Sequence, residues 1–400
     1  MIIKERRYNI AHYLLGALPA RLGDEMSGQT ILLVALAATG TIRIGSTLLA
    51  GLTFSAALGG PLLGAFLDRS RHPGKVLAAV LGLYALGLGL IVVTLGHIPI
   101  WISVATALAV GFFMPAISGG WSSQLKSFVT DEYMTRASAI DATTFNIAGL
   151  VGPAAAGLIA AWLGVNWAIV VLMALLVAAL PMALLLPKHP RHGDTRITHT
   201  TSFWHDVASG FTVIVKNRAL LRITLTSVIS YMGIGMLWVI YPLVGKELFG
   251  KAGYGGVLAS VLSIGALLAT MVYAKWPTKR SPDTIAFATT LALAVAMLVL
   301  AFANNIFIAL IAMLVAGAAD GPQLAAIFAV RHREAPERLR SQVFTTGASL
   351  KITAAAIGTS LAGLLSTTSL TATVIMAGAV QVLAAIVFVV FRNKVRNSVK

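Results

Sequence analysis

The sequence contains no cysteine among its 400 residues, and only 11% of its residues are charged. Without cysteine the chain can form neither disulfides nor thiolate metal sites, and it has no cysteine nucleophile. Soluble proteins carry about 25% charged residues, so this low value, with 58% hydrophobic residues, argues against a soluble globular domain. The composition predicts an integral membrane protein.

Motifs of several enzyme and ATP-driven classes are also missing. No Gly-x-x-x-x-Gly-Lys-Ser/Thr loop is present, so we expect no ATP hydrolysis within this chain. No Gly-x-Ser-x-Gly nucleophile turn occurs, and the eight histidines form no His-x-x-x-His pair beside an acid. The first apolar segment is too long for a cleaved signal peptide. We predict a protein that is not an enzyme and that uses no metal or other cofactor.

Acidic residues are scarce, since 14 Asp and Glu stand against 30 Lys and Arg. The basic residues gather in short loops between apolar segments, a pattern that positive-inside bias and anionic lipid headgroups produce. No stretch outside the apolar segments is long enough to form a nucleic-acid-binding domain. We therefore predict contact with membrane lipids and no binding of nucleic acid.

Charged residues and Gly/Pro punctuation divide the chain into twelve apolar segments long enough to cross a bilayer as helices. They cover residues 10–39, 44–67, 76–96, 98–121, 137–163, 166–187, 219–245, 255–274, 284–303, 305–329, 341–365 and 368–391. The predicted fold class is an all-α integral membrane protein with twelve transmembrane helices. Of the loop cations, only Arg43, Lys246 and Lys251 fall on one side, which predicts cytoplasmic termini in a bacterial-type cytoplasmic (inner) membrane.

The longest polar stretch divides the chain into two halves. We predict six-helix bundles at residues 1–187 and 219–400, joined by a cytoplasmic linker at 188–218. The latter part of this linker has the pattern of a short interfacial helix. Four positions recur at an offset of 206 or 207 residues: Gly152 with Gly358, Gly157 with Gly363, Arg69 with Lys275, and Pro115 with Pro322. A nearly constant offset indicates two duplicated, pseudo-symmetric halves.

The first apolar segment carries three charged residues, Arg21, Asp24 and Glu25, at its middle. An Arg or Asp at the centre of a transmembrane helix costs about 2.5–3.5 kcal/mol, so such residues usually mark a functional site. The carboxylates follow Arg21 by three and four residues, and we expect both to reach its guanidinium on one helix face. One acid is then in surplus, which predicts a proton-exchange site.

Further polar residues fall inside other segments. Asp320 precedes a Gly-Pro pair in the tenth segment, and we expect it to join proton coupling and to line a cavity with Gln323, or else to cap the helix break locally. Lys351 lies well inside the eleventh segment, where it can pair with Asp320 or Glu25, or repel cationic substrates. Asp141, near the start of the fifth segment, is interpreted as part of a salt bridge at the membrane interface.

Twelve segments in two similar halves resemble the major facilitator superfamily, and the loop after the second segment strengthens the resemblance. Gly64-Ala-Phe-Leu-Asp68-Arg69 resembles the superfamily's cytoplasmic signature Gly-x-x-x-Asp-Arg-x-Gly-Arg-Arg, although its last three positions are not kept here. The resemblance implies a gating role for Gly64, Asp68 and Arg69. Asp68 is expected to cap a helix end of the other half, and Arg69 to join a charge relay that stabilises the outward-facing state.

Two further motifs resemble the exporters of this superfamily. Gly149-Leu-Val-Gly152-Pro153-Ala-Ala-Ala-Gly157 is similar to the antiporter motif that ends Gly-Pro-x-x-Gly-Gly. The resemblance implies export and a gating hinge at these residues, where small side chains let helices approach closely. The opening region, Arg21-Leu-Gly-Asp24 through Gly60-Pro61-Leu-Leu-Gly64, resembles the branch that includes siderophore and macrolide efflux proteins.

The resemblance also implies a central substrate cavity lined by aromatic, methionine and polar side chains, which suit amphipathic substrates. The predicted lining is Phe113, Met114, Asn146, Tyr231, Trp238, Tyr241, Gln323 and Lys351. We predict a monomeric, proton-coupled exporter of small organic molecules that works by alternating access. Two alternatives stay open: a symporter or uniporter whose polar or anionic nutrient is bound by Arg21 and Lys351, and a lipid flippase.

Overall fold

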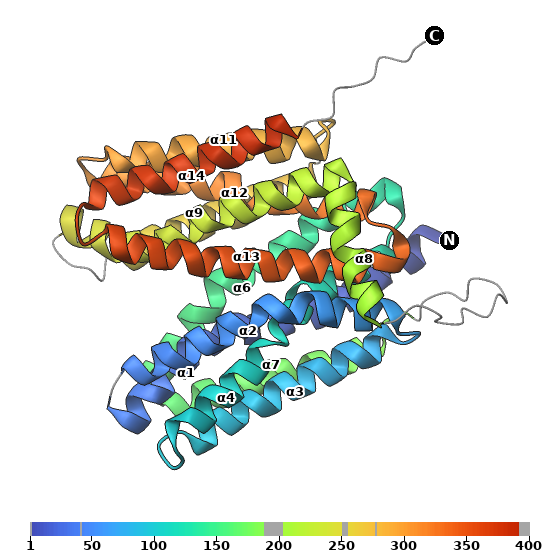
Figure 1. The fold of residues 1–400 in the computed structure, drawn as a ribbon, viewed down its shortest axis with the longest axis horizontal. Helices are drawn as coiled ribbons and strands as arrows, with labels where there is room; N and C mark the ends of the chain where they lie inside the picture. Colours follow the sequence, from blue (N-terminus) through green and yellow to red (C-terminus); the bar gives the residue numbers. More distant parts are fainter. Residues whose placement is uncertain (1, 41, 188–202, 250–254, 277, 392–400) are drawn as a thin grey trace, which may run out of the picture. The chain divides into compact units, whose positions relative to one another are not determined.

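The computed structural model describes residues 2–40, 42–187, 203–249, 255–276 and 278–391, with the backbone alone at residues 2–9, 42 and 249. Within these ranges the chain is almost entirely helical and contains no strand (Figure 1). Three parts of the predicted topology lie outside the described residues: linker residues 188–202, the loop cation Lys251, and the basic tail from residue 392.

Long helices cover both halves of the sequence. The first half contains α1 (Ile2–Thr39), α2 (Ile42–Arg69), α3 (Pro73–Thr94), α4 (Ile100–Gly111), α6 (Met134–Leu163) and α7 (Val165–Leu184). The second half contains α9 (Arg218–Phe249), α10 (Gly255–Lys275), α11 (Pro282–Ala301), α12 (Ile306–Glu334), α13 (Arg340–Leu365) and α14 (Leu370–Val390). The shorter α8 (Phe203–Lys216) precedes α9, where the sequence predicts an interfacial helix.

Eleven segments of the described chain are long and apolar enough to cross a membrane. The long helix outside this count is α1, whose mid-helix residues Arg21, Asp24 and Glu25 lower its mean hydropathy. With α1 as the twelfth, the structure confirms the predicted all-α membrane fold. The fourth span departs from a single helix: α4 ends at Gly111, and a π-helical turn (Ala116–Gly120) and the short α5 (Trp121–Gln124) follow.

The chain forms two compact units. The first contains residues 1–210 and 337–353, and the second contains residues 211–336 and 354–400. The first unit thus includes the N-terminal half of α13, which the predicted boundary assigned to the second bundle. The division into six-helix bundles at 1–187 and 219–400 stays a prediction.

Each unit has its own helical core. In the first unit α1 packs on α6 and α7, α2 packs on α4, and α3 packs on α7, around buried Tyr13, Tyr84 and Trp121. In the second unit α12 packs on α10 and α11, and α14 packs on α9 and α11. Small residues at these seams let the helix backbones approach closely.

Tight contacts of glycines with neighbouring helices recur in the two units at the offset found in the sequence. An added Cβ atom would meet Met26 at Gly152 and the equivalent Met232 at Gly358. It would meet Phe112 at Gly59 and the equivalent Ala318 at Gly265. In every case the second-unit residue follows its counterpart by 206 positions. The repeat is therefore present in the packing of each unit as well as in the sequence.

Candidate functional site

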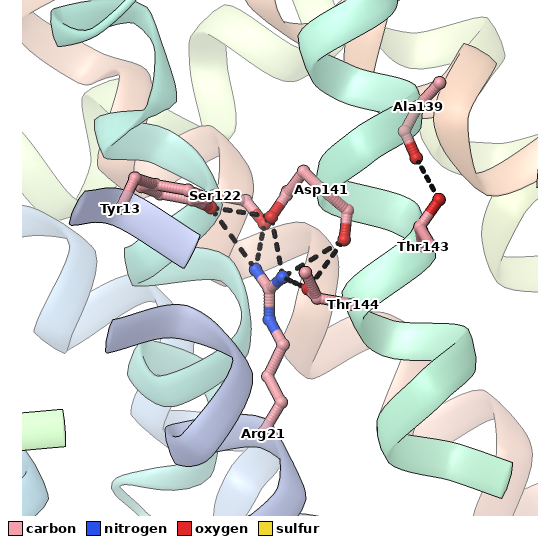
Figure 2. A network of polar contacts seen from close by, with 7 residues as sticks. All are labelled: Tyr13, Arg21, Ser122, Ala139, Asp141, Thr143 and Thr144. Atoms are coloured by element: carbon pink, nitrogen blue, oxygen red, sulfur yellow. Dashed lines mark hydrogen bonds and ion pairs between the residues drawn. The ribbon is translucent and has the colours of Figure 1, made fainter. Parts of the chain in front are cut away.

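The partner of Arg21 is Asp141 on α6 (Figure 2). Arg21 Nη1 donates to Asp141 Oδ1 at 2.6 Å, and the two side chains are 2% and 0% exposed. Tyr13 OH, two turns earlier on α1, donates to the same carboxylate oxygen at 2.6 Å. A fully buried ion pair is neutral as a unit, so Arg21 is already compensated here.

Two hydroxyl groups complete this network. Arg21 Nη2 donates to Ser122 Oγ of α5 at 3.0 Å, and Ser122 Oγ donates to Asp141 Oδ2 at 2.7 Å. Thr144 Oγ1, one turn after Asp141, accepts from Arg21 Nη1 and donates to the Asp141 carbonyl oxygen at 2.8 Å. The guanidinium also lies over the Phe145 ring, 3.7 Å from Cζ to the ring centroid. Hydrogen bonds of this kind offset the cost of removing both charges from water.

This geometry corrects two predictions. The expected pairing of Arg21 with Asp24 and Glu25 does not form, because the Arg21 guanidinium bonds to α6 and α5 while the Asp24 carboxylate accepts from α3. Asp141 is not in a salt bridge at the membrane interface, since it is fully buried against Arg21. Helical spacing shows only which residues of one helix can meet, whereas the carboxylate on the neighbouring helix offers a closer, dehydrated partner.

Asp24 contacts α3 through a tyrosine. Tyr84 OH donates to Asp24 Oδ1 at 2.7 Å, and the tyrosine side chain is fully buried. Ser27 Oγ lies 3.0 Å from the same hydroxyl and donates to the Asp24 carbonyl oxygen at 2.6 Å. Asp24 thus has a neutral hydrogen-bond donor in place of the expected cation.

Of the two acids at the middle of α1, Glu25 is the exposed one. Within the described part of the chain the Glu25 carboxylate makes no hydrogen bond or ion pair. Its backbone lies against Gly152 of α6: a Cβ atom added at that glycine would stand 2.8 Å from Glu25 Cβ. The structure therefore brings together a predicted proton-coupling residue and the predicted antiporter motif.

The antiporter motif has one tight position. Gly152 is buried against α1, whereas an added Cβ at Gly149 or Gly157 would meet no atom within 4 Å. Pro153 follows the tight glycine inside α6 and is partly buried. Of the three glycines in this motif, Gly152 is the one at which a larger side chain would push the neighbouring helix away.

Asp68, at the end of α2, caps the start of α13. Its two carboxylate oxygens accept from the backbone N–H groups of Ser341 and Gln342, each at 2.8 Å. A carboxylate at a helix N-terminus satisfies free N–H groups and the helix dipole. The resemblance implies that Asp68 caps a helix end, and this cap is present. The gating role of Asp68 stays a prediction.

Arg69 contacts α8 next to this cap. Its Nε donates to Asp206 Oδ2 at 2.6 Å, and the Gln342 side chain donates to the Asp206 carbonyl oxygen at 3.0 Å. One turn earlier on α2, Gly64 leaves no room for a Cβ, which would lie 2.5 Å from Gln342 Cα. The ends of α2, α8 and α13 therefore form one packed corner of the first unit.

The second unit holds a neutral polar chain. Ser230 Oγ donates to Gln323 Oε1 at 3.3 Å, Gln323 Nε2 donates to Thr290 Oγ1 at 2.7 Å, and Gln381 Nε2 donates to the Ser230 carbonyl oxygen at 2.8 Å. All four side chains are buried. Ser230 and Thr290 follow Asp24 and Tyr84 by 206 residues, so the equivalent position is acidic in the first unit and neutral in the second.

The remaining predicted cavity residues are spread over both units. Phe113 and Met114 are partly buried at the end of α4, and Asn146 is partly buried on α6. Lys351, also of the first unit, is 9% exposed. In the second unit Tyr241 belongs to the buried core, Trp238 is exposed, and Tyr231 and Asp320 are partly buried. Their role as a substrate lining stays a prediction.

Sequence reasoning missed Tyr13, Ser122, Thr144 and Tyr84. Hydroxyl residues are common inside membrane helices, and their partners here lie on other helices, so no local pattern marks them. The available signal was Asp141, an acid inside an apolar segment that needs a buried cation. Among the described residues, no group of three His, Cys, Asp or Glu side chains is placed to hold a metal ion.

Comparison with known families matches this chain to the Major Facilitator Superfamily over residues 13–252 and 223–400. The uncharacterised MFS-type transporter y4rN of Sinorhizobium fredii is 29% identical, over 93% of this chain and 92% of that protein. Both matches extend over both halves of the sequence.

Solved transporter structures share the fold. The E. coli fucose:proton symporter FucP aligns with a TM-score of 0.78 at 11% identity, over 96% of this chain and 98% of that one. The human organic anion transporter MFSD10 aligns at 0.77 with 16% identity, over 96% and 99%. An outward-facing bacterial homologue of the iron transporter ferroportin aligns at 0.75 with 15% identity, over 96% and 99%. Sequence match and shared fold agree that the chain belongs to the major facilitator superfamily of membrane transporters.

Proposed function

We propose that the protein is a proton-coupled transporter that exports small amphipathic organic molecules by alternating access, with Asp24 and Glu25 as its proton-carrying groups. The observation that carries the proposal is the charge balance of α1. Because Asp141 compensates Arg21, neither of the two neighbouring acids shares that cation. An uncompensated carboxylate inside a membrane span is costly in its charged form, and proton uptake removes that cost.

The contacts of the two acids suggest how protonation acts on the helices. Asp24 holds Tyr84 of α3 by a hydrogen bond that its charge strengthens, so neutralising Asp24 weakens the contact between α1 and α3. Glu25 lies against Gly152, at the seam between α1 and α6. We propose that proton uptake from outside loosens these seams, that the Asp68 cap on α13 opens and closes during the cycle, and that proton release accompanies substrate uptake from the cytoplasm. Asp320 is proposed as a further coupling residue.

Export is supported by the resemblance of Gly149 through Gly157 to the antiporter motif and by the tight seam at Gly152. We also propose a monomer with both termini in the cytoplasm of a bacterial-type cell. The six-helix bundles are proposed at residues 1–187 and 219–400. The rival is a symporter or uniporter whose polar or anionic nutrient is bound by Arg21 and Lys351. Arg21 is 2% exposed and engaged with Asp141, Ser122 and Thr144, which disfavours its part in such a site.

Proton flux in sealed liposomes tests the proposal. The wild-type protein is compared with Asp24→Asn and Glu25→Gln under an imposed pH gradient, with lipophilic cations and other amphipathic drugs as probes. We expect substrate-dependent proton movement that at least one of these variants abolishes. Glu25→Asp, which keeps a carboxylate, serves as the matched control and should retain coupling. Gradient-independent transport that persists in both neutral variants would contradict proton coupling and favour a uniporter.

A further inference from the structure

The six residues Gly119–Gln124, hereafter the connecting segment, contact two separate features of the first unit. One feature is the buried pair of Arg21 and Asp141. The other is the start of α13, which Asp68 caps. The proposed function involves both features but supplies no link between them.

Ser122 provides the contact with the ion pair. Its hydroxyl accepts from Arg21 Nη2 at 3.0 Å and donates to Asp141 Oδ2 at 2.7 Å, and its side chain is fully buried (Figure 2). The hydroxyl therefore bridges the two charged groups, as the Tyr13 hydroxyl also does. Moving this hydroxyl away would leave one guanidinium N–H and one carboxylate oxygen short of a partner, which is costly in a buried site.

The next two residues of the connecting segment contact α13. Ser123 Oγ donates to Ser341 Oγ at 3.1 Å, and Gln124 Nε2 donates to the same oxygen at 3.4 Å. The backbone N–H of Ser341 is also one of the two groups that Asp68 caps. Ser341 thus joins the connecting segment to the cap.

Ser122 and Ser123 are consecutive residues of α5, so their side chains point about 100° apart and reach different partners. The first residues of the connecting segment belong to the π-helical turn Ala116–Gly120. Gly119 in this turn lies so close to α13 that an added Cβ would stand 2.6 Å from the Phe344 carbonyl oxygen. Backbone lies directly against backbone at this contact, so a shift of the α13 start changes the packing of the connecting segment.

We propose that Ser122 and Ser123 are positioning residues that couple the Arg21–Asp141 pair on α1 and α6 to the capped start of α13. Release of α13 from Asp68 removes the Ser341 contacts, lets the connecting segment relax, and withdraws Ser122 from the ion pair. Loss of the Ser122 contacts in turn favours release of α13. This coupling rests on the proposed function only in that transport uses the opening of α13. A purely structural role for Ser122 would lower stability without changing α13.

The absence of cysteine allows a direct test in the full-length protein. Leu339→Cys places one thiol just before α13, at a side chain that is 5% exposed and should react with a maleimide only when the start of α13 leaves. We expect Asp68→Asn to raise the labelling rate in nanodiscs. Ser122→Ala should raise the labelling rate about 5-fold, which is the factor that one lost hydrogen bond produces. This effect reports coupling, because Ser122 itself makes no hydrogen bond to α13.

Ser103→Ala is the matched control, since Ser103 is a fully buried serine of α4 whose hydroxyl has no hydrogen-bond partner in the described part of the chain. Its labelling rate should equal that of the parent, and Ser122→Thr, which keeps the hydroxyl, should stay within twofold. Equal rates for Ser122→Ala and Ser103→Ala, whether both slow or both fast, would overturn the coupling. The readout needs no substrate, so coupled labelling in a protein without proton-driven transport would refute the proposed function and leave this inference standing.

Discussion

Arg21 and Asp141 are each costly inside a membrane span and tolerable only together. Their burial at 2% and 0% exposure, with hydroxyl groups on three sides, leaves water no access to either charge. Such a pair adds little stability compared with apolar residues of similar size, because desolvation offsets the attraction. Removing one partner is different, since the other charge then stays buried without compensation.

Asp141→Leu should therefore lower the free energy of unfolding by about 3–5 kcal/mol. The double variant Arg21→Met/Asp141→Leu should recover most of that loss, because no uncompensated charge remains. Denaturant unfolding in detergent measures both variants. If the double variant is no more stable than Asp141→Leu, the side chains do not act as a pair.

Tyr84 is the residue whose single hydroxyl donates to Asp24. Tyr84→Phe keeps the buried ring and removes that donor. A hydrogen bond to a charged group contributes about 1.5–3 kcal/mol, so we expect at least a tenfold change in proton-coupled transport. Tyr273→Phe is the control, because the Tyr273 hydroxyl has no hydrogen-bond partner within the described residues. Equal liposome flux for both variants would remove Asp24–Tyr84 from the coupling path.

At the scale of helices, α1 presents its charged and polar side chains to different neighbours. Arg21 faces α6 and α5, Asp24 faces α3, and Glu25 is exposed beside α6. Asp24 and Glu25, as successive residues, point about 100° apart with Arg21 between them around the helix, so the two acids reach different neighbours. The helix thereby separates the compensated charge from the two acids that we propose carry protons.

The seam between α1 and α6 depends on Gly152. Gly152→Ala places a Cβ 2.8 Å from Glu25 Cβ, so the helices must separate by several tenths of an ångström. We expect a loss of transport of at least tenfold with only a modest loss of stability, measured as liposome flux beside thermal unfolding. Gly149→Ala and Gly157→Ala, which meet open space, should keep transport and stabilise α6 by up to about 1 kcal/mol. Similar losses in all three variants would point to helix flexibility instead of the seam.

At the scale of the whole molecule, the two units repeat each other's packing but not their polar chemistry. The tight glycine of α6 and its counterpart in α13 meet equivalent methionines, Met26 and Met232, at the same offset. The acid of the first unit, Asp24, is replaced by Ser230 in the second. The duplicated scaffold therefore repeats the position of Asp24 without repeating its acid.

The membrane topology is open to a direct test in the cysteine-free chain. Single cysteines at Arg43 and Lys246 should react with an impermeant maleimide added outside intact cells. Cysteines at Arg71 and Arg338 should react only after the membrane is permeabilised, because the predicted topology has the basic loops in the cytoplasm. All four side chains are exposed in the structure, so accessibility within the protein does not limit the reaction. The reverse labelling pattern would invert the predicted orientation.

Much of the fold could be predicted because each transmembrane helix satisfies its own backbone hydrogen bonds. Length and apolarity therefore locate the spans, and residue offset reveals the duplication. The break in the fourth span was not predictable, because no residue pattern marks the π-helical turn at Ala116–Gly120, where Gly119 approaches α13. The membership of the α13 start in the first unit was not predictable either, since contacts distant in sequence decide it.

The candidate site divides in the same way. The sequence by itself determined that Arg21, Asp24 and Glu25 lie at mid-span and that Gly152 and Asp68 belong to recognisable motifs. Only the tertiary structure decided the partners: Asp141 for Arg21, a tyrosine for Asp24, and the seam with α6 for Glu25. The physical reason is that burial makes a partner on a neighbouring helix worth more than a solvated neighbour on the same helix. Which helix faces which is a property of packing, and no local spacing records it.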